Sequence, residues 1–142
     1  MKKVVVPTEH EEQVAVIAWF DLEYPHYEGM LFAIPNGAYK GKATRASFKD
    51  EGLRPGVPDL FLPIPMNQYH GLFIEMKRQK GSVTSDHQKD WISKLNKQNY
   101  PSRVCKGAEP AIDAIKAYMS GRLCKTCWQE HGVPECQGCS AI

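Results

Sequence analysis

The 142-residue chain has 18 lysines and arginines against 16 aspartates and glutamates, and 42% of its residues are hydrophobic. This composition is typical of one globular domain with a small appendage. No apolar run approaches the ~18 residues that a membrane span requires. The three valines near the N-terminus are too few for a secretory signal. We therefore expect a cytoplasmic protein with no membrane partner.

The first predicted element is a helix over residues 9–24. Thr8 is placed to cap its N-terminus, and Pro25 ends it. The apolar residues that recur at helical spacing, and that we expect to face the core, are Val14, Ile17, Ala18 and Leu22, widened by Trp19 and Phe20.

Three apolar segments predict strands in the next part of the chain. Residues 30–35 indicate a short buried strand, whereas the polar and basic residues 38–54 fit either a helix or a loop. The glycines and prolines of GLRPGVPD then form a rigid turn, which places Asp59 at the start of a strand over residues 59–62. The third strand covers residues 71–77.

The remaining elements alternate between helix and strand. Ser85 followed by Gln88 is a capping-box signature, and the helix it begins extends to about residue 98. Its expected buried residues are Trp91, Ile92 and Leu95. A strand over residues 100–105 and a helix over residues 109–119 follow, and Gly121 ends the last helix. The order α-β-β-β-α-β-α predicts an α/β fold, with a mixed sheet flanked by helices.

Two acidic residues and a lysine interrupt the apolar strands. Glu75 and Lys77 are two residues apart in one predicted strand, so their side chains share a face, whereas Met76 points into the core. The preceding strand pairs with theirs as a hairpin, and Asp59 then lies opposite Glu75. Two carboxylates that meet there raise each other's pKa, and a hard divalent cation removes that cost. The spacing alone also fits an exposed ion pair beside a turn-capping aspartate.

The segments GLRPGVPDLFLP and GLFIEMKRQKG, in that order, resemble the VRR-NUC branch of the PD-(D/E)xK nuclease superfamily, which has phage and bacterial members. The resemblance extends over roughly residues 8–119. It includes Glu9 with Gln13, the IPNG turn, and Gln88 with Trp91. It implies a restriction-endonuclease-like αβββαβ core and a cytoplasmic setting in a bacterium or a phage-infected cell.

The resemblance also implies a magnesium- or manganese-dependent phosphodiesterase. By position, the metal ligands would be Asp59, Glu75 and the Met76 backbone carbonyl, with Lys77 as the catalytic lysine. A glutamate of the first helix usually completes such a site. Glu9 fits best because it stands four residues before Gln13 and ten before Trp19, and Glu12 is its competitor. Gln88 would be a supporting polar residue.

By the same resemblance the substrate is DNA, cut by in-line attack of water to leave a 5′-phosphate. Branched or junction DNA and a homodimer are further expectations by analogy. The residues proposed to contact backbone phosphates are Arg45, Arg54, Lys80 and Lys89. The alternative is a non-catalytic nucleic-acid or protein-binding module that retains the fold, and the intact set Asp59, Glu75 and Lys77 favours the nuclease.

Four of the five cysteines lie near the C-terminus, in two C-x2-C pairs. Cys124, Cys127, Cys136 and Cys139 predict a structural Zn²⁺ site. His131 lies between the pairs and fits as a substitute ligand, and reduced thiols in an unfolded tail are the alternative. Cys105, in a strand, is expected in the core. We accordingly divide the chain into a nuclease domain, residues 1–121, and a zinc-binding tail, residues 122–142.

Overall fold

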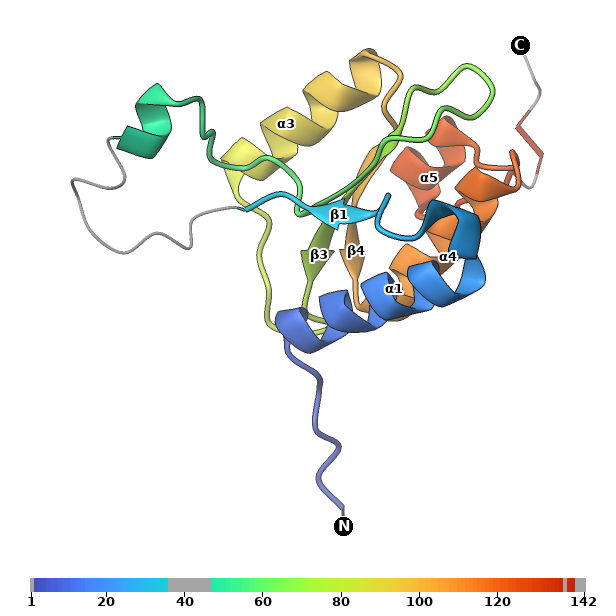
Figure 1. The fold of residues 1–142 in the computed structure, drawn as a ribbon. Helices are drawn as coiled ribbons and strands as arrows, with labels where there is room; N and C mark the ends of the chain where they lie inside the picture. The colour runs from blue at the N-terminus through green and yellow to red at the C-terminus, as the bar shows by residue number, and fades with distance from the viewer. Residues whose placement is uncertain (1, 36–46, 137, 140–142) are drawn as a thin grey trace.

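The computed structural model describes residues 2–35, 47–136, 138 and 139. Within these residues a four-stranded sheet has the order β1-β2-β3-β4. Its strands are β1 (Phe32–Ala33), β2 (Leu60–Leu62), β3 (Leu72–Lys77) and β4 (Ser102–Lys106). The strand β2 is antiparallel to both β1 and β3, whereas β4 runs parallel to β3. The predicted mixed sheet is confirmed (Figure 1).

The described helices are α1 (Glu9–Glu23), α3 (Asp86–Lys97), α4 (Ala108–Met119) and α5 (Lys125–His131), with a 3-10 turn η1 (Pro25–Tyr27). Thr8 and Ser85 cap α1 and α3 as expected, each in a reciprocal capping box. Residues 47–50 are also helical and stand away from the body of the domain (Figure 1). The helix α5, in the cysteine tail, has no counterpart among the predicted elements.

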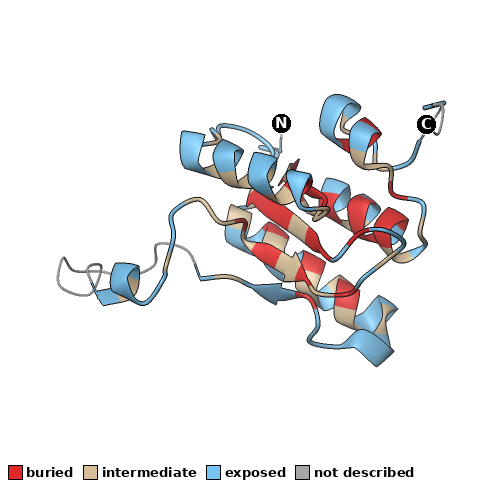
Figure 2. Cartoon of the chain, turned by 90° about the horizontal axis from the view of Figure 1, so that it is seen from above, coloured by how far each residue is buried: buried red, intermediate tan, exposed pale blue. Residues whose placement is uncertain are grey.

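One face of the sheet forms the hydrophobic core. The alternating residues of β2 and β3 that point to this face are at most 1% exposed: Leu60, Leu62, Leu72, Ile74 and Met76. They belong to one cluster with Val16 and Phe20 of α1 and with Ile115 of α4. Cys105 joins the same cluster, as predicted. Figure 2 shows the buried residues gathered on the strands and on the inner sides of the helices.

The predicted core stripe of α1 is only partly right. Phe20 is buried, and Ile17 and Trp19 pack against the core, but the other expected residues are exposed. Val14 and Leu22 are 54% and 84% exposed, whereas Glu12, Val16 and Phe20 are buried. These three buried residues are spaced by four, so they form a continuous face of the helix. Hydrophobicity alone selected the neighbouring stripe because a buried glutamate gives no apolar signal.

Two further predicted burial patterns are wrong. The strand expected over residues 30–35 is the two-residue strand β1, and both of its residues are exposed because it lies at the edge of the sheet. In α3, Trp91, Ile92 and Leu95 are only half-buried, and Asn96 is the buried residue. Asn96 exchanges two hydrogen bonds with the Ser102 backbone, which explains why a polar residue faces inward.

No helix in the described part of the chain is long and apolar enough to cross a membrane.

Candidate functional site

Asp59 lies next to β3 because of the β2–β3 register. Leu60 pairs with Ile74, so the residue before Leu60 falls beside the next residues of β3. The Met76 backbone N–H donates a hydrogen bond of 2.8 Å to Asp59 Oδ2. The predicted meeting of Asp59 with the Glu75 end of the neighbouring strand is therefore present.

Glu75 is buried, with 2% of its surface exposed. Lys77 Nζ lies 3.5 Å from Glu75 Oε1, and Gln88 Nε2 donates a hydrogen bond to the same oxygen. Glu75 Oε2 has no hydrogen-bond partner among the described residues. A buried carboxylate oxygen without a partner is costly, and it is therefore a position where a ligand is expected.

The surroundings of Asp59 and Glu75 disfavour ionisation of both carboxyl groups at once. Burial and the nearby charge of Asp59 raise the pKa of Glu75 to about 8. Burial also raises the pKa of Asp59, against the Met76 hydrogen bond that lowers it. The positive charge of Lys77 lowers both pKa values and only partly offsets these effects. Lys77 alone does not neutralise the two carboxylates. A divalent cation bound between them would supply the positive charge that allows both to ionise.

The donor set fits Mg²⁺ or Mn²⁺, which prefer oxygen ligands. It consists of Asp59, the unpartnered Glu75 Oε2 and the Met76 carbonyl. The N–H and C=O of one strand residue point to the same side, and the Met76 N–H points to Asp59. The Met76 carbonyl consequently projects toward Asp59 and away from β4.

The two glutamates proposed from the first helix have different surroundings. Glu12 is 5% exposed, accepts a hydrogen bond of 2.7 Å from Gln79 Nε2, and accepts another from the Ala108 backbone N–H. Its carboxylate thus joins α1 to the loops after β3 and β4. Glu9 is half-buried, and its charge raises the pKa values of both Asp59 and Glu75. This arrangement favours Glu9 as the third carboxylate at the site.

Glu9, Asp59 and Glu75 do not gather as tightly as the thiols of the tail. Among the described residues, the four cysteines form the one group of three or more candidate ligands whose atoms all lie within 4.8 Å of one another.

The turn before Asp59 is held against the start of α3 by a close contact at Gly56. This glycine has φ +85°, and a Cβ placed on it would lie 2.5 Å from the His87 carbonyl carbon. Only glycine accommodates both the left-handed backbone and this approach. The rigid turn expected from GVPD therefore also positions α3, which carries Gln88 to Glu75.

Of the four residues proposed to contact phosphates, the structure describes Arg54, Lys80 and Lys89. Arg45 lies outside the described residues. Arg54 is exposed, and its guanidinium donates hydrogen bonds to the Lys49 and Leu53 carbonyls. Lys80 and Lys89 are exposed, in the loop after β3 and in α3. Their contacts with DNA stay predictions.

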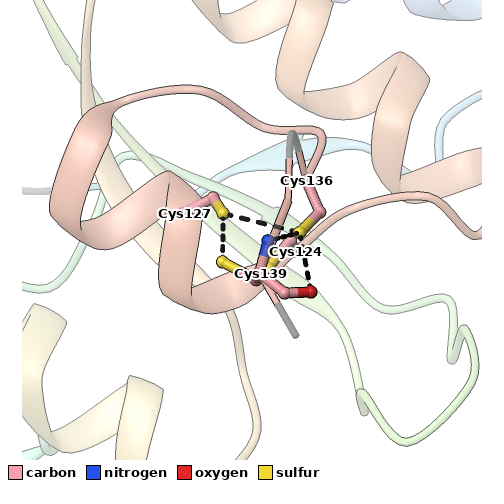
Figure 3. Close-up of side chains that lie close together, drawn as sticks. All are labelled: Cys124, Cys127, Cys136 and Cys139. Atoms are coloured by element: carbon pink, nitrogen blue, oxygen red, sulfur yellow. Dashed lines mark hydrogen bonds between the residues drawn. The ribbon is translucent and has the colours of Figure 1, made fainter. Parts of the chain in front are cut away.

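The four cysteines of the tail form a compact cluster (Figure 3). Cys127 Sγ lies 3.8 Å from Cys136 Sγ, close to the ~3.8 Å edge of a zinc tetrathiolate with Zn–S bonds of about 2.3 Å, and 2.8 Å from Cys139 Sγ, which is shorter than that edge. Backbone N–H groups of Gly138 and Cys139 lower the pKa of Cys136 to about 7, which favours its thiolate. The pKa values of Cys127 and Cys139 are raised by their contacts with neighbouring cysteines, so the compact arrangement of the four thiols is the feature that fits a metal ion.

The tail packs on the rest of the protein through α5. Trp128, next to Cys127, is 2% exposed and belongs to the main hydrophobic core. Arg103 of β4 donates hydrogen bonds to the Trp128 and Gln129 carbonyls at the end of α5. Sequence patterns did not indicate this attachment, because Trp128 is a single apolar residue in a polar segment. The division at residue 121 stays a prediction.

Comparisons with known proteins agree with the fold. The family model described as "VRR-NUC domain" matches residues 8–109. A solved structure titled "VRR_NUC domain protein" is similar with a TM-score of 0.72 and 30% sequence identity, over 82% of this chain and 91% of that chain. No curated protein matches the chain. The matched segment contains Asp59, Glu75, Lys77 and Gln88 and ends before the cysteine cluster.

Proposed function

The chain belongs to the VRR-NUC family, and from this membership we propose that it is a metal-dependent DNA endonuclease that hydrolyses phosphodiester bonds. Its fold is of the nuclease type, and its family is nuclease-related. The observation that carries the proposal is the meeting of the half-buried Asp59 with the buried Glu75, with Lys77 Nζ 3.5 Å from Glu75. An exposed ion pair beside a turn does not account for a glutamate that is 2% exposed.

We assign Asp59, Glu75, the Met76 carbonyl and Glu9 to the Mg²⁺ or Mn²⁺ site. The cation, when bound, supplies Lewis-acid neutralisation of charge at the scissile phosphate and makes water a better nucleophile. The Met76 N–H holds Asp59 Oδ2, and Gln88 holds Glu75 Oε1, so both carboxylates are oriented before substrate arrives.

Lys77 is the residue that acts on the reacting groups. Its ammonium is held beside Glu75, where it donates hydrogen bonds to an attacking water or to the phosphoryl oxygens. Negative charge builds on those oxygens as the bond to phosphorus forms, and a fixed ammonium stabilises it more in the transition state than in the ground state.

The DNA form we propose is a branch or junction, by family analogy. A non-catalytic binding module is the alternative, and it predicts no strand cleavage under any metal condition. Plasmid and branched DNA are incubated with Mg²⁺ or Mn²⁺ and with wild-type protein, Asp59→Ala or Lys77→Ala. We expect cleavage by wild type and at least a hundredfold loss in both variants. Absence of cleavage by wild type, or equal cleavage by the variants, contradicts the proposal.

We also assign structural zinc to the cluster of Cys124, Cys127, Cys136 and Cys139. The compact thiols and the lowered pKa of Cys136 support it. Zinc there would hold the loop after α5 to the start of that helix, and so keep Trp128 in the core.

A homodimer is the assembly we propose, through the outer face of α1. Val14 and Leu22 leave an apolar stripe exposed on this helix, which supports a partner surface. The mass of wild type and Leu22→Glu, measured by light scattering after gel filtration, tests it. We expect a dimer for wild type and a monomer for the variant, and a monomeric wild type contradicts the proposal.

A further inference from the structure

A groove of about 930 Å³ follows the outer edge of β4, with α3 on one side and α5 on the other. The strand β4 is the last in the sheet order, so this edge carries no further strand among the described residues. Figure 1 shows α3 and α5 on opposite sides of this strand. The groove is distinct from the candidate metal site, because none of Glu9, Asp59 and Glu75 lines it.

The charged residues that line the groove are all positive. They are Lys89, Lys97, Arg103, Lys106 and Lys125. None of them forms an ion pair within the described part of the chain. Unneutralised like charges around one hollow repel each other and cost stability, and an anionic ligand repays that cost.

Two of these cations build the walls of the groove. Arg103 donates to carbonyls at the end of α5, and Lys125 Nζ donates to the Asn96 carbonyl and to Asn99 Oδ1. They tie the tail to β4 and to the end of α3. Lys89, Lys97 and Lys106 are exposed, so their ammonium groups are available to a ligand.

One end of the groove adjoins the candidate active site. Lys106 is the register partner of Lys77, and Lys89 follows Gln88 directly in α3. The other end lies at Lys97, nine residues beyond Gln88, which is ~14 Å along a helix. A polyanion in the groove would therefore lead from the carboxylates to the cysteine tail.

We propose that this groove holds a single strand of nucleic acid that extends from the cleavage site, an inference that rests on the proposed nuclease function. A single strand presents phosphates and exposed base faces together, and the groove presents both kinds of complement. Its cations face phosphates, and apolar residues such as Ile92 and Val104 between them offer contact to bases. A duplex exposes no base faces to such a surface.

The test measures binding, not cleavage. Fluorescence anisotropy follows a labelled oligothymidylate and a hairpin duplex of equal charge, with Ca²⁺ in place of Mg²⁺. Lys97→Glu is compared with Lys94→Glu, which makes the same charge change in the same helix outside the groove. We expect Lys97→Glu to weaken single-strand binding about tenfold and to lower the salt dependence by about one phosphate contact. Lys94→Glu should change binding less than about twofold.

Lys97→Gln, which removes the charge without reversing it, should give a smaller loss in the same direction. Equal binding by Lys97→Glu and Lys94→Glu overturns the proposal, as does an equal loss on the duplex. Thermal melting confirms that the variants are folded. If the protein cleaves DNA but its groove variants bind the single strand normally, the groove proposal fails and the nuclease proposal stands. If the groove variants weaken single-strand binding but the wild-type protein cleaves nothing, the nuclease proposal fails and the groove still binds a single strand.

Discussion

The side-chain amide of Gln88 donates a hydrogen bond to the buried Glu75 carboxylate. The side-chain oxygen of Gln88, Oε1, accepts a hydrogen bond of 2.9 Å from the Ser85 backbone N–H in the capping box of α3. One side chain thus begins a helix and orients a candidate metal ligand. The start of α3 and the end of β3 are consequently fixed relative to each other.

Removing Gln88 should impair cleavage more than stability. Gln88→Ala and Ser85→Ala both break the capping box, so each should lose about 1 kcal/mol of unfolding free energy. Only Gln88→Ala also releases Glu75, and we expect a further tenfold to hundredfold loss in cleavage rate, as for other residues that orient metal ligands. Urea unfolding and cleavage rates measure the two effects. Equal cleavage by both variants would contradict a positioning role.

Stability without divalent cations should fall as pH rises from about 5 to 8. Glu75 has a raised pKa of about 8 in the folded protein against an ordinary 4.5, so the folded state binds more protons in this interval. Folding is then favoured at low pH, and the loss is at most about 1.4 kcal/mol per pH unit for one group. Melting temperatures in EDTA-free, metal-free buffer measure the slope.

Adding Mg²⁺ should counteract this slope. The cation competes with the proton on Glu75, so the rise in melting temperature with Mg²⁺ should be larger at pH 8 than at pH 6. Glu75→Gln carries no titrating carboxyl and is the control. It should lose the part of the pH slope that Glu75 causes, while Asp59 keeps its own raised pKa. It should also lose the response to Mg²⁺, and a Mg²⁺ response that persists would place the cation elsewhere.

Substitution of Glu12 should lower stability, whereas substitution of Glu9 should weaken metal binding and cleavage. Glu12→Ala leaves the Ala108 N–H and Gln79 without their acceptor, so it should lose about 1–3 kcal/mol of stability. Glu9→Ala should change stability little and should weaken Mg²⁺ binding and cleavage. Chemical unfolding and Mg²⁺ titration of both variants distinguish them. A stable Glu12→Ala with weakened metal binding would reverse the assignment.

Purified protein should contain about one zinc ion per chain, which Cys127→Ser loses. The cysteine precedes the buried Trp128, so loss of zinc should also lower the melting temperature. Cys105→Ala removes a cysteine outside the cluster and should keep its zinc. Metal analysis by mass spectrometry gives the stoichiometry, and an unchanged zinc content in Cys127→Ser would exclude the site.

Gly56→Ala should reduce both stability and cleavage. Gly52→Ala is a matched control, because Gly52 also has a positive φ, of +101°, but a Cβ there meets nothing within 4 Å. Backbone strain of about 1 kcal/mol should appear in both variants. The overlap with His87 adds to it in Gly56→Ala alone and displaces α3 from Glu75. Melting temperature and cleavage rate measure the difference, and indistinguishable variants would show that this contact is unimportant.

Local sequence patterns were sufficient for most of the helices and strands, although not for α5. The N-cap Thr8, the capping box of Ser85 and the two-residue alternation of β3 depend only on near neighbours in the chain, so they were predicted correctly. The pairing of β2 with β3 also followed, because a short connection joins them as a hairpin.

Tertiary structure alone decided which surfaces are buried and which charges meet. The choice of face in α1 depends on Glu12, whose burial is stabilised by Gln79 and Ala108, residues far away in the sequence. The attachment of Trp128 to the core, and the gathering of five cations along β4, likewise depend on segments distant in sequence. Hydrophobic periodicity predicts whether a residue is buried only when the burial of its face depends on apolar packing. Polar contacts between residues distant in sequence can bury a charged side chain such as Glu12, and only the tertiary structure determines which of these contacts form.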